Sequence, residues 1–246
     1  MSSLPQCSSS TSAINSPCFF TPGSHHYTAL EINTEVFLQT SSSGSVHSFE
    51  VDQTFNIKEN GIIHEDFNKE RLSNPGAGIP GSSGGSGGSF GGRGGVASNM
   101  MLSWGQAMPY DNAMNVSKSG STGGGKGGGM GGGLLLIKSR KFILNGVIRA
   151  PGQNGQANTN GGGGSGGGVS INSYDAEGVG RVEVFGGLGS GKGGGGGGGR
   201  ISFKYEYGNF QGLTNVFGGT TGKQLFDFIL TLSVPVVFLN SPNLRP

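Results

Sequence analysis

The chain has 246 residues, of which 53 are glycine, 33% are hydrophobic and only 12% are charged, with a formal net charge of +2. Glycine normally supplies roughly 7% of a protein. A chain so poor in apolar side chains cannot form an ordinary compact core along its whole length. With no basic block and no acidic tail, the sequence also argues against electrostatic capture of nucleic acid or of an anionic membrane.

The N-terminal segment, residues 1–28, is rich in Ser, Thr and Pro, and we expect an irregular arm there. It contains both cysteines, Cys7 and Cys18. Two cysteines define neither a disulfide framework nor a metal site, so we expect isolated thiols, with a disulfide as the alternative if the protein is secreted. We expect the paired His25 and His26 to be exposed. No signal peptide is predicted, because a basic region followed by a continuous apolar stretch is absent at the N-terminus.

Strand signals dominate from Ala29 to Phe67. Asn60-Gly61-Ile62-Ile63 matches Asn145-Gly146-Val147-Ile148 residue for residue in type, and Asn-Gly favours a tight turn. In both copies an apolar cluster begins 12 residues before the glycine, at Phe49 and at Leu134. The two segments are therefore predicted to be equivalent units of a repeat.

A third, looser copy runs from Val169 to Phe185, and a further strand begins at Ile201. The spacing from Leu134 to Val169 is 35 residues and that from Val169 to Ile201 is 32, which is typical of a repeat array. We therefore predict a mainly β fold, a glycine-rich parallel β-helix-like solenoid with long glycine loops that reverse sharply or pack as polyproline II-type strands. The residues expected to stack on one another are Leu134, Leu136, Val169, Ile171, Ile201 and Phe203.

The pattern divides the chain into three parts: an irregular arm, 1–28; solenoid repeats, 29–212; and an apolar tail, 213–246. Within the solenoid, residues 72–133 are expected to form an exposed loop, with Met100, Met101 and Trp104 lying over its side. Asn115 begins a glycosylation sequon in this loop.

The tail after Gly212 differs in character from the repeats, and we expect it to be truncated or foreign to the domain. Its longest apolar stretch, Leu225–Leu239, is interrupted by Asp227 and Pro235. It falls short of the roughly 20 residues that a membrane-spanning helix needs, so no membrane span is predicted.

Two glycine-rich motifs resemble known binding segments. Gly186 to Lys192 nearly forms a phosphate-binding loop, but Gly193 stands where Ser or Thr must ligate Mg²⁺, and no helix is predicted to follow. Arg93 lies in Phe90-Gly91-Gly92-Arg93-Gly94-Gly95, which is similar to a single RGG box. Such segments bind RNA through many interleaved arginines and aromatics, so we expect Arg93 to be a solvated side chain.

The acids and histidines form no catalytic pattern. His25, His26, His47 and His64 lack metal-ligand spacing with the cysteines. The His64-Glu65-Asp66 sequence is expected to be a surface acid cluster, because no nucleophile partners it. Asp175 and Glu177 project from one strand face and are expected to solvate it. We predict no catalytic, cofactor-binding or metal-ligating residues.

The order of motifs between residues 46 and 207 carries a resemblance. Its parts are the tract Gly84 to Gly95, the block Gly131 to Ile137 leading to Asn145 through Ala150, and Gly193 to Gly199 followed by Arg200-Ile201. It resembles a glycine-rich repeat module of very large secreted or cell-surface proteins of plants, protists and some invertebrates, often labelled ephrin-type-B-receptor-like. It is more distantly similar to the glycine-rich region of anaplastic lymphoma kinase. The resemblance implies an extracellular structural or adhesive repeat, without catalytic residues, cut from a longer chain.

We therefore expect a non-enzymatic extracellular structural or adhesion module, with a protein or carbohydrate partner at the cell surface. The first alternative is a β-helix enzyme acting on polysaccharide, which would need a cluster of acids on one face. The second is a flexible glycine-rich RNA-binding protein.

Overall fold

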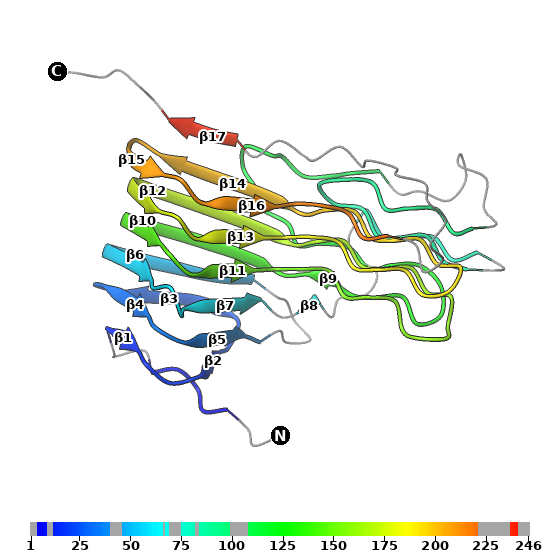
Figure 1. Cartoon of the computed structure of the whole chain (residues 1–246), viewed down its shortest axis with the longest axis horizontal. Coiled ribbons are helices and arrows are strands. Elements are labelled where there is room, and N and C mark those ends of the chain that lie inside the picture. The colour runs from blue at the N-terminus through cyan, green and yellow to red at the C-terminus, as the bar shows by residue number, and fades with distance from the viewer. Residues whose placement is uncertain are drawn as a thin grey trace.

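The chain is a stack of parallel β-strands from which long glycine segments extend to one side (Figure 1). The computed structural model describes residues 4–8, 12–39, 46–65, 67–68, 75–81, 84–98, 108–220 and 237–240. Within these ranges there is no helix, and the strands form two all-parallel sheets and one small antiparallel pair. This confirms the mainly β prediction, and the stacking is consistent with a parallel β-helix or solenoid.

The larger sheet has nine strands, in the order β1-β4-β6-β10-β12-β14-β17, with β3 also paired to β6 and β15 to β12. Its strands are β1 (Ala13–Ile14), β3 (Gly23–Tyr27), β4 (Leu30–Ile32), β6 (Val46–Ile57), β10 (Leu134–Leu144), β12 (Gly168–Gly178), β14 (Arg200–Tyr205), β15 (Tyr207–Phe210) and β17 (Val237–Asn240).

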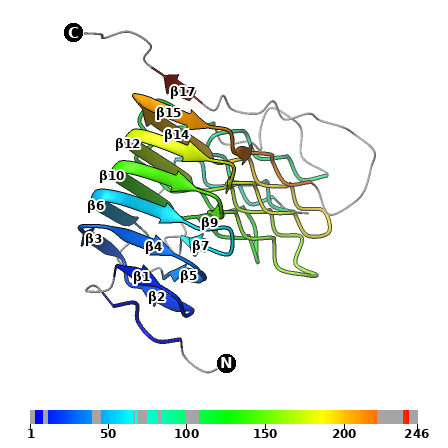
Figure 2. The same cartoon turned by 60° about the vertical axis from the view of Figure 1, so that its left-hand side comes forward.

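The second sheet has six strands, in the order β16-β13-β11-β7-β5-β2. They are β2 (Cys18–Phe20), β5 (Glu35–Leu38), β7 (Ile62–Glu65), β11 (Val147–Arg149), β13 (Arg181–Glu183) and β16 (Leu213–Asn215). The antiparallel pair joins β8 (Phe67–Asn68) to β9 (Gly131–Gly132). Figure 2 shows the strands as successive layers from β2 to β17.

Successive passes of the chain stack in register. Val147 pairs with Ile62 and Ile148 with Ile63, which confirms that the two Asn-Gly segments are equivalent. The predicted stacking of Val169 on Ile201 and of Ile171 on Phe203 is confirmed. In β10 the register is one residue from the prediction, because Leu135, and not Leu134, pairs with Val169. Because adjacent residues of a strand point to opposite faces, this slip turns Leu134 and Leu136 away from the central core. They pack outside it, against Phe90 and Val116.

Side chains of both sheets meet in one core, whose centre is a column of phenylalanines. Phe49, Phe55, Phe142 and Phe203 are fully buried. Their ring centroids lie 5.7 Å apart for Phe49 and Phe55, 5.9 Å for Phe55 and Phe142, and 5.7 Å for Phe142 and Phe203. Aromatic pairs at such separations add about 0.5–1.5 kcal/mol each to their area burial, so the column joins β6, β10 and β14.

The glycine tracts form a second packed region, in which the backbone makes the contacts. The N–H groups of residues 162 to 167 donate in turn to the carbonyl oxygens of Gly124, Gly194, Gln153, Ser121, Gly197 and Ala150. Every third donor therefore returns to the same neighbouring segment, three positions along it. This is the three-residue repeat of an extended polyproline II strand, and the strand formed by residues 162–167 donates to three others.

Close approach of these strands leaves no room for side chains. A Cβ added at Gly196 would lie 1.9 Å from the carbonyl oxygen of Gly164, and one added at Gly164 would lie 1.9 Å from that of Met130. We call the packed segments 84–95, 120–133, 152–168 and 186–199 the glycine bundle. Of the two arrangements expected for the tracts, close packing is the one that the structure shows.

Three boundary predictions need correction. The arm 1–28 is not irregular in its described part, because it supplies β1, β2 and β3. The described part of the expected exposed loop, 72–133, is largely packed: Ser86 and Phe90 are fully buried, and its two glycine tracts belong to the bundle. The tail 213–246 continues the stack through β16 and β17. Met100, Met101 and Trp104 lie outside the described residues, as does most of Leu225–Leu239.

A second small core attaches Phe90, Tyr110 and Val116, which precede β9 in the chain, to the outer face of the larger sheet. Phe90, Val116 and Leu134 are buried together, with Tyr110 and Leu136 packed against them. The Arg200 guanidinium lies 5.7 Å from the centroid of the Phe90 ring, and its Nε donates to the Tyr110 carbonyl oxygen over 2.9 Å. These residues are thereby held to β10 and β14 by apolar, cation–π and hydrogen-bonding contacts.

Candidate functional site

Strand alternation places one row of side chains across the outer face of the six-stranded sheet. Within β2, β5, β7, β11 and β13 the neighbouring residues Phe20, Val36, Ile63, Ile148 and Val182 point inward and are buried. The residue next to each of them in the same strand therefore points outward. By register, Phe19 stands beside Phe37, Phe37 beside His64, His64 beside Arg149 and Arg149 beside Glu183. We call these five residues the outer row.

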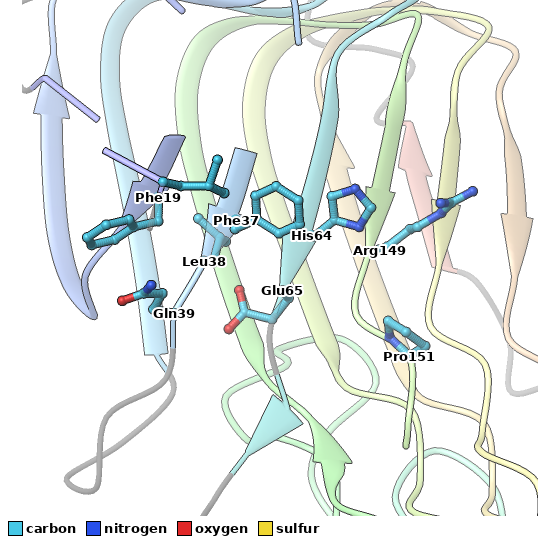
Figure 3. Close-up of a pocket in the computed structure, with 9 residues that line it drawn as sticks. Phe19, Phe37, Leu38, Gln39, His64, Glu65, Arg149 and Pro151 are labelled. Atoms are coloured by element: carbon cyan, nitrogen blue, oxygen red, sulfur yellow. The ribbon is translucent and has the colours of Figure 1, made fainter. Parts of the chain in front are cut away.

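A groove of about 430 Å³ follows part of this row. Figure 3 shows Phe19, Phe37, His64 and Arg149 side by side, with Glu65 and Pro151 below them. The Phe37 and His64 rings are stacked, with centroids 4.8 Å apart and planes 8° from parallel. The residues that line the groove are Leu4, Phe19, Phe37, Leu38, Gln39, His64, Glu65, Arg149 and Pro151.

Charged groups border the aromatic part of the row. Arg149 Nε donates to Glu183 Oε2 over 2.9 Å, and His64 Nε2 lies 3.9 Å from Glu35 Oε1. Burial lowers the pKa of His64; the Glu35 carboxylate opposes this and the Arg149 guanidinium adds to it. The site thus combines an apolar stack that favours neutral His64 with an adjoining ion pair, an arrangement suited to contact with a partner's apolar and polar groups.

Most amides of the phosphate-loop motif donate hydrogen bonds to other parts of the chain. The N–H groups of Gly186, Gly187 and Gly189 donate to the carbonyl oxygens of Phe217, Gly164 and Thr220. Those of Leu188 and Lys192 donate to Asn154 and Asn160 side chains. No helix follows in the described chain. Amides that are already bonded within the chain are not available to cradle a phosphate.

The RGG-like segment is also part of the bundle. Gly91 and Gly92 both donate to the carbonyl oxygen of Gly198, and Phe90 is buried. Arg93 is exposed, as expected. A packed segment of this kind lacks the interleaved, flexible arrangement through which RGG sequences contact RNA.

The histidines and cysteines differ from expectation in three places. His25 is not exposed; it is half-buried, and its ring stacks on that of the fully buried His47 at 5.9 Å. Glu65 is 3% exposed, so His64 and Glu65 are not a surface cluster, and Asp66 lies outside the described residues. Cys7 and Cys18 form a disulfide rather than remaining isolated thiols. Their spacing alone could not decide the pairing.

The paired acids share one cation. Lys141 Nζ lies 3.5 Å from Asp175 Oδ2 and 2.9 Å from Glu177 Oε1, which places both carboxylates on the outer face of β12, as predicted. In the described ranges no three His, Cys, Asp or Glu side chains group so as to hold a metal ion. Likewise, no described helix is long and apolar enough to cross a membrane.

Sequence reasoning missed the outer row as a site. Phe19, Phe37 and Arg149 become neighbours only through the parallel pairing of strands that are far apart in the sequence. For Phe37 and Arg149, the signal that could have found them is their position next to an inward-pointing apolar residue in a predicted strand. For Phe19 there was no such signal, because the arm 1–28 was expected to be irregular. Comparisons with protein-family models, with curated proteins and with solved structures find no match to this chain.

Proposed function

We propose that this chain is a non-enzymatic extracellular structural or adhesion module, a glycine-rich parallel β-helix-like solenoid whose outer row contacts a partner at the cell surface. The observation that carries the proposal is the glycine bundle. The strand formed by residues 162–167 donates backbone hydrogen bonds to three neighbouring strands, and at many glycines of the bundle an added Cβ would overlap a neighbouring backbone atom. Such a region is a stiff scaffold with its amides engaged internally.

The Cys7–Cys18 disulfide supports an extracellular location, because disulfides form and persist in oxidising compartments. It joins the segment before β1 to β2, at the end of the stack. A disulfide there resists fraying of the terminal layer, where strands have a neighbour on one side only. This is consistent with a protein that must remain folded outside the cell.

The outer row supports an adhesive role. It presents half-buried phenylalanine and histidine rings beside an ion pair, across a groove on a rigid sheet. Aromatic and arginine side chains are the residues that contribute most at contact surfaces. The partner class that we propose is a protein or a carbohydrate of the cell surface.

The test is adhesion under flow. Beads coated with the folded chain settle on surfaces carrying polysaccharide or cell-surface protein, and the fraction retained is measured. We expect retention that Phe37→Ala reduces strongly and that Leu213→Ala, an exposed control on the same sheet, leaves unchanged. Retention no better than that of beads coated with an unrelated protein contradicts the proposal. Cleavage of the polysaccharide by the soluble chain would favour the enzymatic alternative.

A further inference from the structure

Two of the five tyrosines lie on the surface, and they are neighbours. Tyr27 and Tyr205 are buried, and Tyr110 is partly buried in the small core. Tyr174 and Tyr207 are 49% and 52% exposed. Their ring centroids are 4.8 Å apart, with the planes inclined by 45°. All five tyrosines belong to the described residues, so Tyr174 and Tyr207 are the only exposed pair of tyrosines in the chain.

The backbone holds this pair in place. Asp175 pairs with Tyr207 across β12 and β15, and the Glu206 N–H donates to the Tyr174 carbonyl oxygen over 3.2 Å. The two side chains thus leave successive layers of the stack at the same corner. The neighbouring Tyr207 phenol raises the pKa of Tyr174, which favours the neutral phenol.

We propose that Tyr174 and Tyr207 are a site of oxidative cross-linking, in which a haem peroxidase with hydrogen peroxide converts them into an intramolecular dityrosine. Each phenol loses one electron and one proton. The two phenoxyl radicals join through the ring carbons next to their hydroxyl-bearing carbons, forming a C–C bond. The hydrogens on the joined carbons then move to the phenol oxygens, which restores both aromatic rings. One hydrogen peroxide accepts the two electrons and two protons and becomes two waters.

The geometry favours a bond within one chain over a bond between chains. The rings are in contact before oxidation, at a separation that a second molecule would have to reach by diffusion. The partners lie 33 positions apart in the sequence (207 − 174), so the bond would close a long loop of the unfolded chain. A cross-link of this kind stabilises by restricting the unfolded state, as a disulfide does.

This inference rests on the proposed extracellular structural role only for its biological use, which is to lock successive layers covalently. Its chemistry is testable without that role. If the adhesion assay fails, the cross-link remains measurable on the same purified chain, and a failed cross-link leaves the adhesion result standing.

The experiment exposes the full chain, in dilute solution, to a haem peroxidase and hydrogen peroxide. We expect the intact mass of the monomer to fall by two hydrogen atoms, dityrosine fluorescence to appear and peptide mapping to join Tyr174 to Tyr207. Oxidation of methionine adds oxygen and therefore shifts the mass in the opposite direction. The cross-linked chain is also expected to unfold at a higher temperature than the untreated chain.

Two variants make the assignment specific. Tyr207→Phe, which keeps the ring and removes the phenol, should abolish the intramolecular product, and Tyr205→Phe, two positions away, should retain it. Circular dichroism verifies that both variants are folded. Intramolecular dityrosine of equal yield in Tyr207→Phe, or cross-links formed only between chains, would overturn the proposal.

Discussion

The strand stack and the glycine bundle are built from the same passes of the chain but are held together by different parts of it. In the stack, phenylalanine and aliphatic side chains of both sheets fill the space between strands. In the bundle, the distance between strands is so short that a carbonyl oxygen occupies the place of a side chain. The first region tolerates a change of side chain but not of polarity, whereas the second tolerates no side chain at many positions.

The length of each pass follows from this difference. In the N-terminal layers, without a glycine segment, His25 pairs with Phe49, 24 positions later. In the later layers, Val169 pairs with Leu135 and with Ile201, at spacings of 34 and 32 positions. The additional residues are the glycine excursions that form the bundle. A pass therefore lengthens without enlarging the apolar core, which explains how a chain with 33% hydrophobic residues folds.

The largest effect is expected from a charge in the stack. Ile171 is fully buried between Ile137 and Phe203, so Ile171→Asp should cost about 4 kcal/mol or more, because no partner for the carboxylate lies in the core. Leu136→Asp, on the outward side of β10, should cost only about 1–2 kcal/mol. Urea unfolding of both variants measures the difference. Equal losses would show that the observed register does not determine which residues form the core.

The next effect separates the two regions directly. Gly196→Ala should destabilise by about 3 kcal/mol, because its Cβ would overlap the Gly164 carbonyl oxygen in the middle of the bundle. Gly95→Ala is the matched control, since its nearest neighbour would lie at 3.2 Å, and its effect should be about 1 kcal/mol or less. Denaturant unfolding is the measurement. A bundle that accepts both changes equally would not be close-packed.

The sequence predicted the stack better than the bundle for a physical reason. Alternating apolar residues and the Asn-Gly turns locate strands, and the pairing of Val147 with Ile62 follows from them. The exact register did not follow, because the run Leu134 to Ile137 is apolar on both faces and gives no alternation to read. Leu134 and Leu136 are apolar because they cover a second core, which the sequence did not reveal.

The packing of 84–95 and 120–133 could not be predicted because glycine carries no side-chain pattern. The same tract suits a flexible loop and a close-packed strand, and the choice depends on which carbonyl groups lie beside it. The outer row was missed for a related reason. Phe37 and His64 are 27 positions apart (64 − 37), and their stacking depends on parallel pairing rather than on any local motif. Long-range register is the information that composition and short motifs lack.

A smaller effect concerns acid stability at the N-terminal end of the stack. His47 is fully buried and its Nε2 donates to the Gln39 carbonyl oxygen over 2.8 Å, while its Nδ1 has no partner. Burial, with a smaller contribution from the neighbouring His25, lowers the pKa of His47 to about 4, although the hydrogen bond to Gln39 opposes this shift. Protonation would add a positive charge and an N–H without an acceptor.

Because the pKa of His47 is depressed in the folded state, the unfolded chain binds its proton first as the pH falls. The stability that neutral His47 provides is fully present above pH 6.5 and is lost as the pH falls from 6.5 to about 4. The loss amounts to about 2–3 kcal/mol of unfolding free energy. In His47→Gln, the unfolding free energy should therefore fall less steeply with decreasing pH across this interval than in the unmodified chain. His26→Gln, which alters an exposed histidine beside Glu50, should keep the wild-type slope. An unchanged slope in His47→Gln would mean that another group is responsible.

The smallest effect is expected on the outer face of the stack, where Lys141 joins Asp175 and Glu177. Lys141→Met keeps the apolar stem and removes the charge, so it should cost less than about 1 kcal/mol, because the pair is exposed and solvent screens it. The loss should shrink further as salt is added. Lys126→Met, an exposed lysine in the glycine bundle, should change nothing measurable. A large, salt-independent loss at Lys141 would mean that ion pairs across successive layers stabilise the stack as much as its core does. The stack would then differ from the backbone-bonded bundle in its ion pairs as well as in its side-chain core.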